Sequence, residues 1–102
     1  KITFERAVEL CSTNVAKIFG CDNKGSISVG KDADIVIYDK DKDFTISVDN
    51  MHSDLDHTIW EGKQLHGYPI RTYLRGNVVY DNGDFVGTPG LGEYVKRSPR
   101  KH

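Results

Sequence analysis

The chain has 102 residues, a length that accommodates one domain at most. Hydrophobic residues make up 37% and charged residues 28%, a globular composition that is lean in core-forming side chains. The formal net charge of −1 gives no reason to expect nucleic acid or an anionic membrane as a partner. The basic run Lys96–His102 is predicted to be a solvated tail.

The number of cysteines and the lack of long apolar runs indicate the cellular compartment. The chain has two cysteines, Cys11 and Cys21, fewer than a disulfide framework in a small secreted domain usually needs. Cys11 falls on the apolar face of a predicted helix, so we predict a buried thiol rather than a redox or metal role. No apolar run approaches the roughly 20 residues of a membrane-spanning helix, and the N-terminus lacks the apolar core of a signal peptide. We therefore expect a soluble, cytoplasmic protein.

A helical pattern comes first in the chain. Thr3 suits the N-cap position, and apolar residues then recur at helical spacing, which predicts a helix over about 4–12. Ser12–Asn14 prefer capping positions and predict an interruption, followed by a shorter helix over 14–19. Gly20 is the expected C-terminal stop. The broad apolar face of this segment needs a partner surface, either the downstream strands or a domain outside the chain.

Five or six short strands are predicted after the helix. Ile27–Val29 and Ile35–Tyr38 are rich in β-branched residues and flank a polar turn at Gly30–Asp34, which predicts a strand–turn–strand unit. Lys40–Asp43 has the composition of a charged turn, and Phe44–Val48 alternates as a half-buried strand does.

The second half of the chain combines a long loop with hairpins. Residues 49–66 are polar and irregular, and so long a loop usually has a function or packs against another surface. Pro69 is predicted to start a strand or lie on a sheet edge, before the alternating run Ile70–Leu74. Asn82-Gly83 predicts a type I′ hairpin turn, and Gly87–Gly92 then breaks regular structure.

No group of residues has the pattern of a catalytic site, so we predict no catalytic, cofactor-binding or metal-binding residue. The histidines lack the i, i+2 or i, i+4 spacing that directs two imidazoles to one metal, and we predict exposed or hydrogen-bonded loop residues. Asp32 and Asp34 are predicted to be turn-formers rather than a catalytic carboxylate pair. The four histidines are His52, His57, His66 and His102.

Other candidates for chemistry also have simpler explanations. Ser12 and Ser98 lack a nearby base, so neither is a predicted nucleophile. The glycine-rich run 87–92 lacks the Lys-Ser/Thr pair and the helix start of a phosphate-binding loop. The aromatic residues Trp60, Tyr68 and Tyr73 are assigned to core or interface packing.

The order of several stretches resembles a known family. Lys24–Val36 resembles a signature, KG-x-I-x-x-G-x-D-A-D-hydrophobic, of amidohydrolase-superfamily enzymes. Ser12–Gly20 looks like the last helix of their barrel, with Val15 where many members carry Pro. Later stretches are similar to dihydropyrimidinases and D-hydantoinases in their order and spacing: Thr45–Val48, Trp60–Gly62, Gly67–Ile70, Arg75–Tyr80, Gly83–Gly87 and Gly90–Arg97.

The resemblance implies a fold and a division of the chain. Family members combine a (β/α)8 barrel with a small β-sandwich that is built from both chain ends. We therefore expect a mainly β chain with an N-terminal helical segment, the C-terminal part of that β-sandwich domain, without the barrel. Residues 1–20 would be the last helical segment of the barrel, 21–87 the C-terminal sandwich strands and 88–102 the C-terminal tail. The start at Lys1, without Met, fits a cut chain.

The resemblance also implies an activity for the longer protein. The family opens 5,6-dihydropyrimidine or hydantoin rings by hydrolysis, with two zinc ions bridged by a carboxylated lysine. All its metal ligands lie upstream of the matched region, so this chain is expected to bind no cofactor. Its expected partners are the missing N-terminal part of its own chain and, in a homotetramer, further copies that contact residues 49–66 and 87–97. Neither nucleic acid nor membrane is expected as a partner.

Three alternatives stay open at this point. A non-enzymatic dihydropyrimidinase-related scaffold would have the same C-terminal pattern. A free-standing β module would bind a partner through the 49–66 loop. A related enzyme such as allantoinase is the third alternative, because the substrate-contacting loops are not part of the chain.

Overall fold

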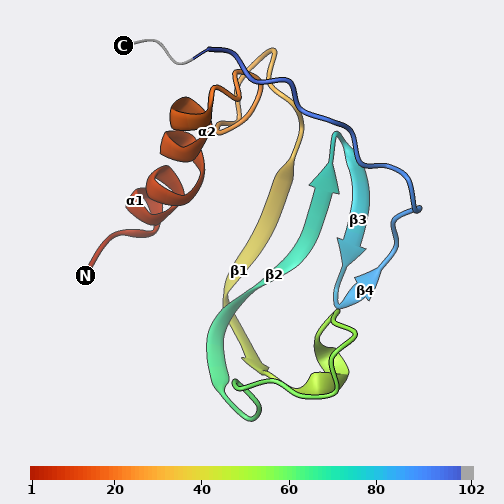
Figure 1. The fold of residues 1–102 in the computed structure, drawn as a ribbon. Helices are drawn as coiled ribbons and strands as arrows, with labels where there is room; N and C mark the ends of the chain where they lie inside the picture. The colour runs from red at the N-terminus through yellow and green to blue at the C-terminus, as the bar shows by residue number, and fades with distance from the viewer. Residues whose placement is uncertain (100–102) are drawn as a thin grey trace.

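The computed structural model describes residues 1–99, in which a helical segment precedes an antiparallel sheet (Figure 1). The sheet has four strands in the order β1-β2-β3-β4, so each strand pairs with its neighbour in sequence. The predicted mainly β fold with an N-terminal helical segment is confirmed. The helical elements are α1 (Phe4–Val8), the π-helical turn η1 (Glu9–Thr13), α2 (Asn14–Phe19) and the short 3-10 turn η2 (Val48–Asn50). The strands are β1 (Ile35–Thr45), β2 (Gln64–Leu74), β3 (Asn77–Asp81) and β4 (Asp84–Phe85).

The helical segment begins and ends where its capping residues predict. The Thr3 hydroxyl accepts a hydrogen bond from the Arg6 backbone N–H at 3.1 Å. At the other end Gly20 adopts a left-handed conformation, with φ of 70°. The predicted interruption at Ser12–Asn14 is a widened turn rather than a break, because the Asn14 N–H bonds the Glu9 carbonyl five residues back. The helix therefore continues through this turn.

The predicted strand–turn–strand unit is wrong in its first half. Ile27 and Val29 lie in irregular backbone and are almost fully exposed, and the strand begins only at Ile35. The turn itself is present, since Gly30 has φ of 90°. Because no strand pairs with residues 27–29, their β-branched side chains do not suffice to form one.

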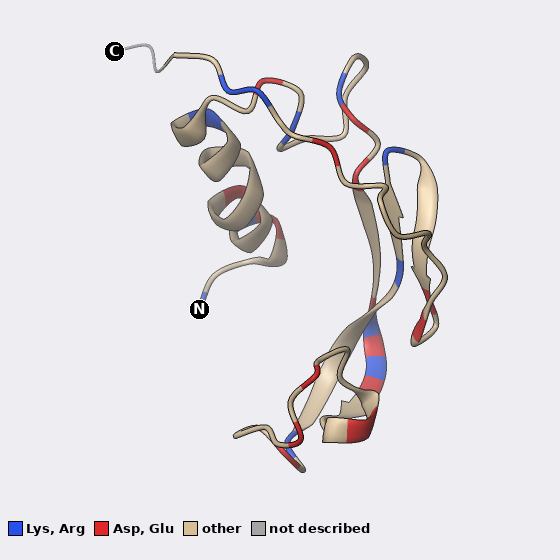
Figure 2. Cartoon of the chain, turned by 45° about the vertical axis from the view of Figure 1, so that its right-hand side comes forward, with Lys and Arg blue, Asp and Glu red and all other residues tan. Residues whose placement is uncertain are grey.

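The predicted charged turn at Lys40–Asp43 is also wrong, because β1 continues through it. The register with β2 shifts between Asp39 and Asp43, so a bulge absorbs the extra residues. Charges of both signs alternate along this part of β1 (Figure 2). Since β1 is an edge strand, this pattern disfavours pairing with another chain. The strand predicted at Phe44–Val48 ends at Thr45, before η2.

Strand β2 is longer than predicted and carries the proline inside it. The strand includes Gln64–His66, the end of the predicted 49–66 loop. Pro69 pairs with Tyr38 at a register shift, instead of starting a strand or lying on a sheet edge. An irregularity of this kind tolerates a residue that lacks an N–H donor.

Two tight turns connect β2, β3 and β4. Arg75 and Gly76 have φ of 46° and 83°, and Asn82 and Gly83 have φ of 48° and 96°. Positive φ at both central residues is the type I′ geometry, whose twist matches that of the strands. The predicted Asn82-Gly83 hairpin is therefore confirmed. The four strands found within residues 1–99 correct the prediction of five or six.

Among residues 1–99 the chain buries very little apolar surface. Ala16 is the one hydrophobic residue in this range that counts as buried, at 9% exposure. The radius of gyration is 15.9 Å, against about 13 Å for a compact domain of this length. Local pairs remain, such as Phe44 stacked on Tyr68 with ring centroids 3.8 Å apart. The chain by itself therefore lacks the packed core that stabilises a free-standing domain.

The contact between Gly25 and the helix gives a first prediction. A Cβ atom added at Gly25 would lie 2.7 Å from the Ala16 Cβ, whereas one at Gly62 would meet no atom within 4 Å. Both glycines have positive φ, so an alanine costs similar backbone strain at each. We expect Gly25→Ala to lower the free energy of unfolding by about 1–3 kcal/mol more than Gly62→Ala, because of overpacking. Chemical denaturation of the whole polypeptide that carries these residues measures the difference, and equal losses would contradict the packing assignment.

Candidate functional site

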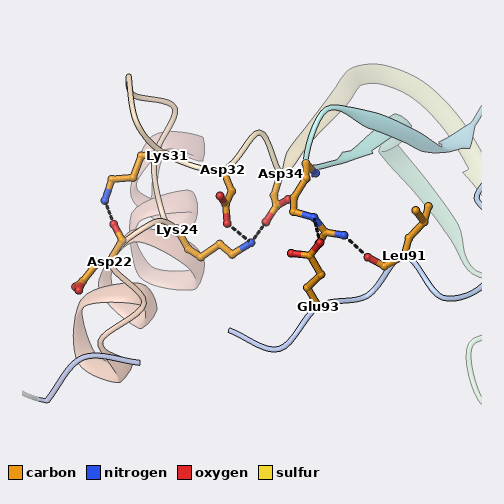
Figure 3. Close-up of polar contacts among 8 residues, drawn as sticks. Asp22, Lys24, Lys31, Asp32, Asp34, Leu91 and Glu93 are labelled. Atoms are coloured by element: carbon orange, nitrogen blue, oxygen red, sulfur yellow. Dashed lines mark hydrogen bonds and ion pairs between the residues drawn. The ribbon is translucent and has the colours of Figure 1, made fainter. Parts of the chain in front are cut away.

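The most connected polar cluster surrounds Lys24 in the loop between α2 and β1 (Figure 3). Its ammonium group pairs with the Asp32 carboxylate at 2.9 Å and also with Asp34. The second Asp34 oxygen accepts the Arg75 backbone N–H at 2.9 Å. The Ala33 carbonyl accepts the Gly76 N–H at 2.9 Å. The cluster therefore connects the loop to the β2–β3 turn.

Arg75 extends this cluster to the C-terminal segment. Its guanidinium donates to the Leu91 carbonyl and lies 3.6 Å from the Glu93 carboxylate. On the other side of the loop, the Lys31 ammonium group donates to the Asp22 carbonyl (Figure 3). Charged groups thus join three segments that are distant in sequence.

Each charge in the centre of the cluster stabilises its partner. The hydrogen bond to Asp34, followed by the one to Asp32, raises the pKa of Lys24. Lys24 in turn lowers the pKa of Asp34, and the Arg75 backbone N–H adds to this effect, although burial opposes it. Both groups are therefore charged at neutral pH, as the members of structural ion pairs are. Each pKa moves away from 7, whereas a group that transfers protons at neutral pH needs a pKa near 7.

The predicted role of Asp32 and Asp34 needs a correction. They organise the loop, but they do not join two strands, because Ile27–Val29 forms none. Their partner Lys24 lies in the same short signature as the two aspartates. The contact with Arg75 spans 41 residues, so no local pattern reveals it.

The lowered pKa of Asp34 gives a second prediction. A carboxyl group whose pKa falls below its unfolded value of 3.8 adds stability above that pH, and this stability disappears as the pH drops further. We expect acid to destabilise the native chain more steeply below pH 3.8 than it destabilises the Asp34→Asn variant. Urea unfolding of the whole polypeptide that carries these residues, at a series of pH values, measures this slope. The exposed loop residue Asp54 provides the control, and Asp54→Asn is expected to keep the native slope.

The histidines do not converge on one site. The His52 Nε2 lies 3.1 Å from the Gly83 carbonyl oxygen, and its ring meets Tyr80 edge-on. The His57 Nδ1 lies 3.0 Å from Asp56, its neighbour in sequence. Within residues 1–99 no three His, Cys, Asp or Glu side chains are grouped so that they could hold a metal ion. His102 lies outside the described residues.

His66 is on β2, rather than in the predicted loop, and pairs with Asp43 across the strands at 2.7 Å. The hydrogen bond to Asp43 raises the pKa of His66 above 6.5. Because the folded pKa is the higher one, the imidazolium stabilises the folded chain fully below pH 6.5, and this contribution is lost as the pH rises through the folded value. The pair is exposed, so its effect on stability is small.

A third prediction tests this pair directly. We expect Asp43→Asn to lower the pKa of His66 toward 6.5, because the substitution removes the carboxylate whose hydrogen bond raises this pKa most. NMR titration of the imidazole resonances measures the value. Asp56→Asn, which alters the neighbour of another histidine, is the control and should leave the pKa of His66 in place. An unchanged value in Asp43→Asn would contradict the pairing.

Other residues that the sequence analysis singled out lie apart from one another. The Ser98 hydroxyl donates to the Asp22 carboxylate, a contact between residues 76 positions apart that no local pattern predicts. Cys11 is exposed, so the predicted buried thiol is wrong for this chain, because the strands do not cover that side of the helix. Tyr68 stacks on Phe44, as predicted for a packing residue. Trp60 is half-exposed beside a hollow of about 320 Å³ lined by the loop residues Val48, Met51, Ser53, Leu55, His57, Thr58 and Ile59.

The helical segment exposes an apolar face. Phe4 packs against Tyr38 of β1, with ring centroids 5.3 Å apart, yet it remains 58% exposed. The rest of the segment stands beside the sheet and does not pack on it (Figure 1). Five large side chains define this helical apolar face, with exposures between 41% and 58%: Phe4, Val8, Val15, Ile18 and Phe19.

The sequence that forms this partial sheet and uncovered helix matches a known protein family. The model of the Amidohydrolase family matches residues 1–80, and the chain belongs to this family. It is 40% identical to a D-hydantoinase of Ralstonia pickettii, over 99% of this chain and 22% of that protein. It is 45% identical to a dihydropyrimidinase of Rattus norvegicus, over 97% of this chain and 19% of that protein.

A solved structure gives the same result. The dihydropyrimidinase from Brevibacillus agri has the same fold over 99% of this chain and 22% of its own, with a TM-score of 0.93 and 45% identity. The chain thus spans about one fifth of the length of these relatives. The resemblance to hydantoinases and dihydropyrimidinases is confirmed, as is the expected partial domain without the barrel. The division at residues 20 and 87 stays a prediction.

Among residues 1–99, none of the helices is both long and apolar enough to span a membrane.

Proposed function

We propose that this chain is the C-terminal, non-catalytic portion of a zinc-dependent cyclic amidohydrolase of the dihydropyrimidinase or hydantoinase type. The observation that carries the proposal is the uncovered helical apolar face, in a chain that spans about one fifth of its relatives. In this proposal residues 1–20 pack against the catalytic barrel, residues 21–87 contribute sandwich strands and residues 88–102 form the tail.

The size of the exposed apolar surface supports a docking role. Full burial of one large apolar side chain contributes roughly 1.5–3 kcal/mol. Since the five residues of the helical apolar face are about half exposed, covering them adds on the order of 5 kcal/mol. This is comparable with the whole stability of a small domain, roughly 5–15 kcal/mol. A covering surface therefore has a large effect on whether this segment folds.

The chemistry of ring opening is assigned to the remainder of the longer protein. The described residues do not fit a zinc site, since residues 1–99 supply no cluster of ligands, and we assign no step of the reaction to them. The names of the relatives point to hydantoin or dihydropyrimidine rings as substrates. We expect the longer protein to be cytoplasmic and homo-oligomeric, with residues 49–66 and 87–97 at the subunit contacts.

A charge on the helical apolar face provides the test and the fourth prediction. In the longer protein, we expect Ile18→Asp to lower the melting temperature and the ring-opening activity together, because a carboxylate would be buried against the barrel. Ser12→Asp places the same charge at an exposed polar position of the same helix and is the matched control. Equal behaviour of the two variants would overturn the docking role.

A free-standing interaction module is the second candidate, favoured by the apolar hollow beside Trp60. The isolated chain of residues 1–102 distinguishes the two. Our proposal predicts that it shows no hydantoin or dihydropyrimidine hydrolysis and no cooperative monomeric unfolding. A sharp thermal transition of a monomer would favour the module. Ring opening by the isolated chain would contradict both candidates.

A further inference from the structure

The C-terminal strap, defined as Leu91–Ser98, spans from the sheet to the end of the helical segment (Figure 1). At its first end the Arg75 guanidinium donates to the Leu91 carbonyl and pairs with Glu93. At its second end the Ser98 N–H donates to the Gly20 carbonyl at 2.8 Å. The Ser98 hydroxyl also donates to the Asp22 carboxylate. The strap therefore has one attachment on the β2–β3 turn and another just beyond α2.

These two attachments matter because the helical segment has few other contacts with the sheet. No backbone of α1, η1 or α2 packs against a described strand. The aromatic pair of Phe4 and Tyr38 lies near the start of the segment, and the Lys24 cluster holds the connecting loop. The strap is attached at the opposite end of the helical segment from Phe4, so it restricts rotation about the Phe4 contact.

Gly20 shows how closely the strap approaches the helix. A Cβ atom added there would overlap the Ser98 carbonyl oxygen and also lie 3.1 Å from the Ser98 nitrogen. The left-handed φ of Gly20 already favours glycine as a helix stop. The same glycine thus serves two purposes, because it ends α2 and leaves room for the backbone of the strap.

We propose that the C-terminal strap is a latch that fixes the orientation of the helical segment relative to the sheet and that opens at its Ser98 end. The Ser98 attachment rests on hydrogen bonds of an exposed residue, whereas the Arg75 side chain is only 24% exposed. When the latch is closed, the helical apolar face is held in one orientation. When it opens, the helical segment keeps only the Phe4–Tyr38 contact and the Lys24 cluster as attachments to the sheet. This inference concerns contacts within the chain, so it goes beyond the proposed function and does not depend on which surface covers the helix.

Hydrogen exchange of the whole polypeptide that carries these residues tests the latch. The first comparison is between Ser98→Asp, which places a second carboxylate beside Asp22, and Ser98→Asn, which is similar in size but uncharged. We expect the protection factor of the residue-98 amide, which bonds the Gly20 carbonyl, to be roughly tenfold lower in Ser98→Asp than in Ser98→Asn, because like charges repel. Strand β2 should keep its native exchange rate in both variants.

Two further variants separate the latch from a general loss of stability. Asp22→Asn in the Ser98→Asp background should restore slow exchange, because it removes the repulsion. Gly20→Ala should speed exchange at the Ser98 amide, whereas Gly30→Ala, also at positive φ but with no atom within 4 Å, should not. If Gly20→Ala does not fold, the Ser98 and Asp22 variants still decide the question.

The outcomes that overturn the latch are specific. One is native exchange at the Ser98 amide that is as fast as in an unstructured peptide. Another is equal exchange in Ser98→Asp and Ser98→Asn, or no restoration by Asp22→Asn. None of these outcomes bears on the proposed function, which is tested by the charge at Ile18 and by ring opening.

Discussion

The carboxylate of Asp34 is the point on which the arrangement of the chain depends. One oxygen pairs with the Lys24 ammonium group and the other accepts the Arg75 N–H. This single side chain connects the loop after the helix to the turn between β2 and β3. Arg75 then connects that turn to Leu91 and Glu93. Charge-assisted hydrogen bonds of this kind are stronger than neutral ones, which is why a few of them hold segments that share little apolar contact.

The same arrangement explains why the chain exposes so much apolar surface. The polar cluster fixes the positions of the helix and the sheet, but it brings no large apolar side chains together. Among residues 1–99, the buried hydrophobic residue Ala16 lies next to Gly25, where the loop returns to the helix. Exposed apolar surface of this extent usually marks a contact with another protein or another part of the same protein. The lengths of the relatives agree with the second case.

Local features of the fold could be predicted from the sequence, because neighbours in the chain determine them. The Thr3 cap, the Gly20 stop and the Asn82-Gly83 turn each depend on residues within a few positions. The charged stretch Lys40–Asp43 could not, because its pairing with β2 outweighs a composition that locally favours a turn. Likewise, Ile27–Val29 has strand-forming residues without a strand to pair with.

The candidate site shows the same limit. Lys24, Asp32 and Asp34 all lie within one short signature. The sequence drew attention to the two aspartates, but it did not indicate that Lys24 pairs with them. The bond from Arg75 to Asp34 joins residues 41 positions apart, and no spacing in the sequence indicates it. The exposure of Cys11 depends on whether another element covers the helix, which periodicity alone does not reveal. A helical pattern indicates which side is apolar and says nothing of what lies against it.

The sequence separation of these contacts also orders the assembly of the chain. The hairpins β2–β3 and β3–β4 close over tight turns and need little loop-closure entropy. The bond between Ser98 and Asp22 joins residues 76 positions apart and requires the sheet to be in place first. During synthesis the helical segment leaves the ribosome before β1 to β4, yet its Ser98 attachment comes from a residue that follows all four strands. The helical segment therefore receives its Ser98 attachment only after the four strands that follow it have been made.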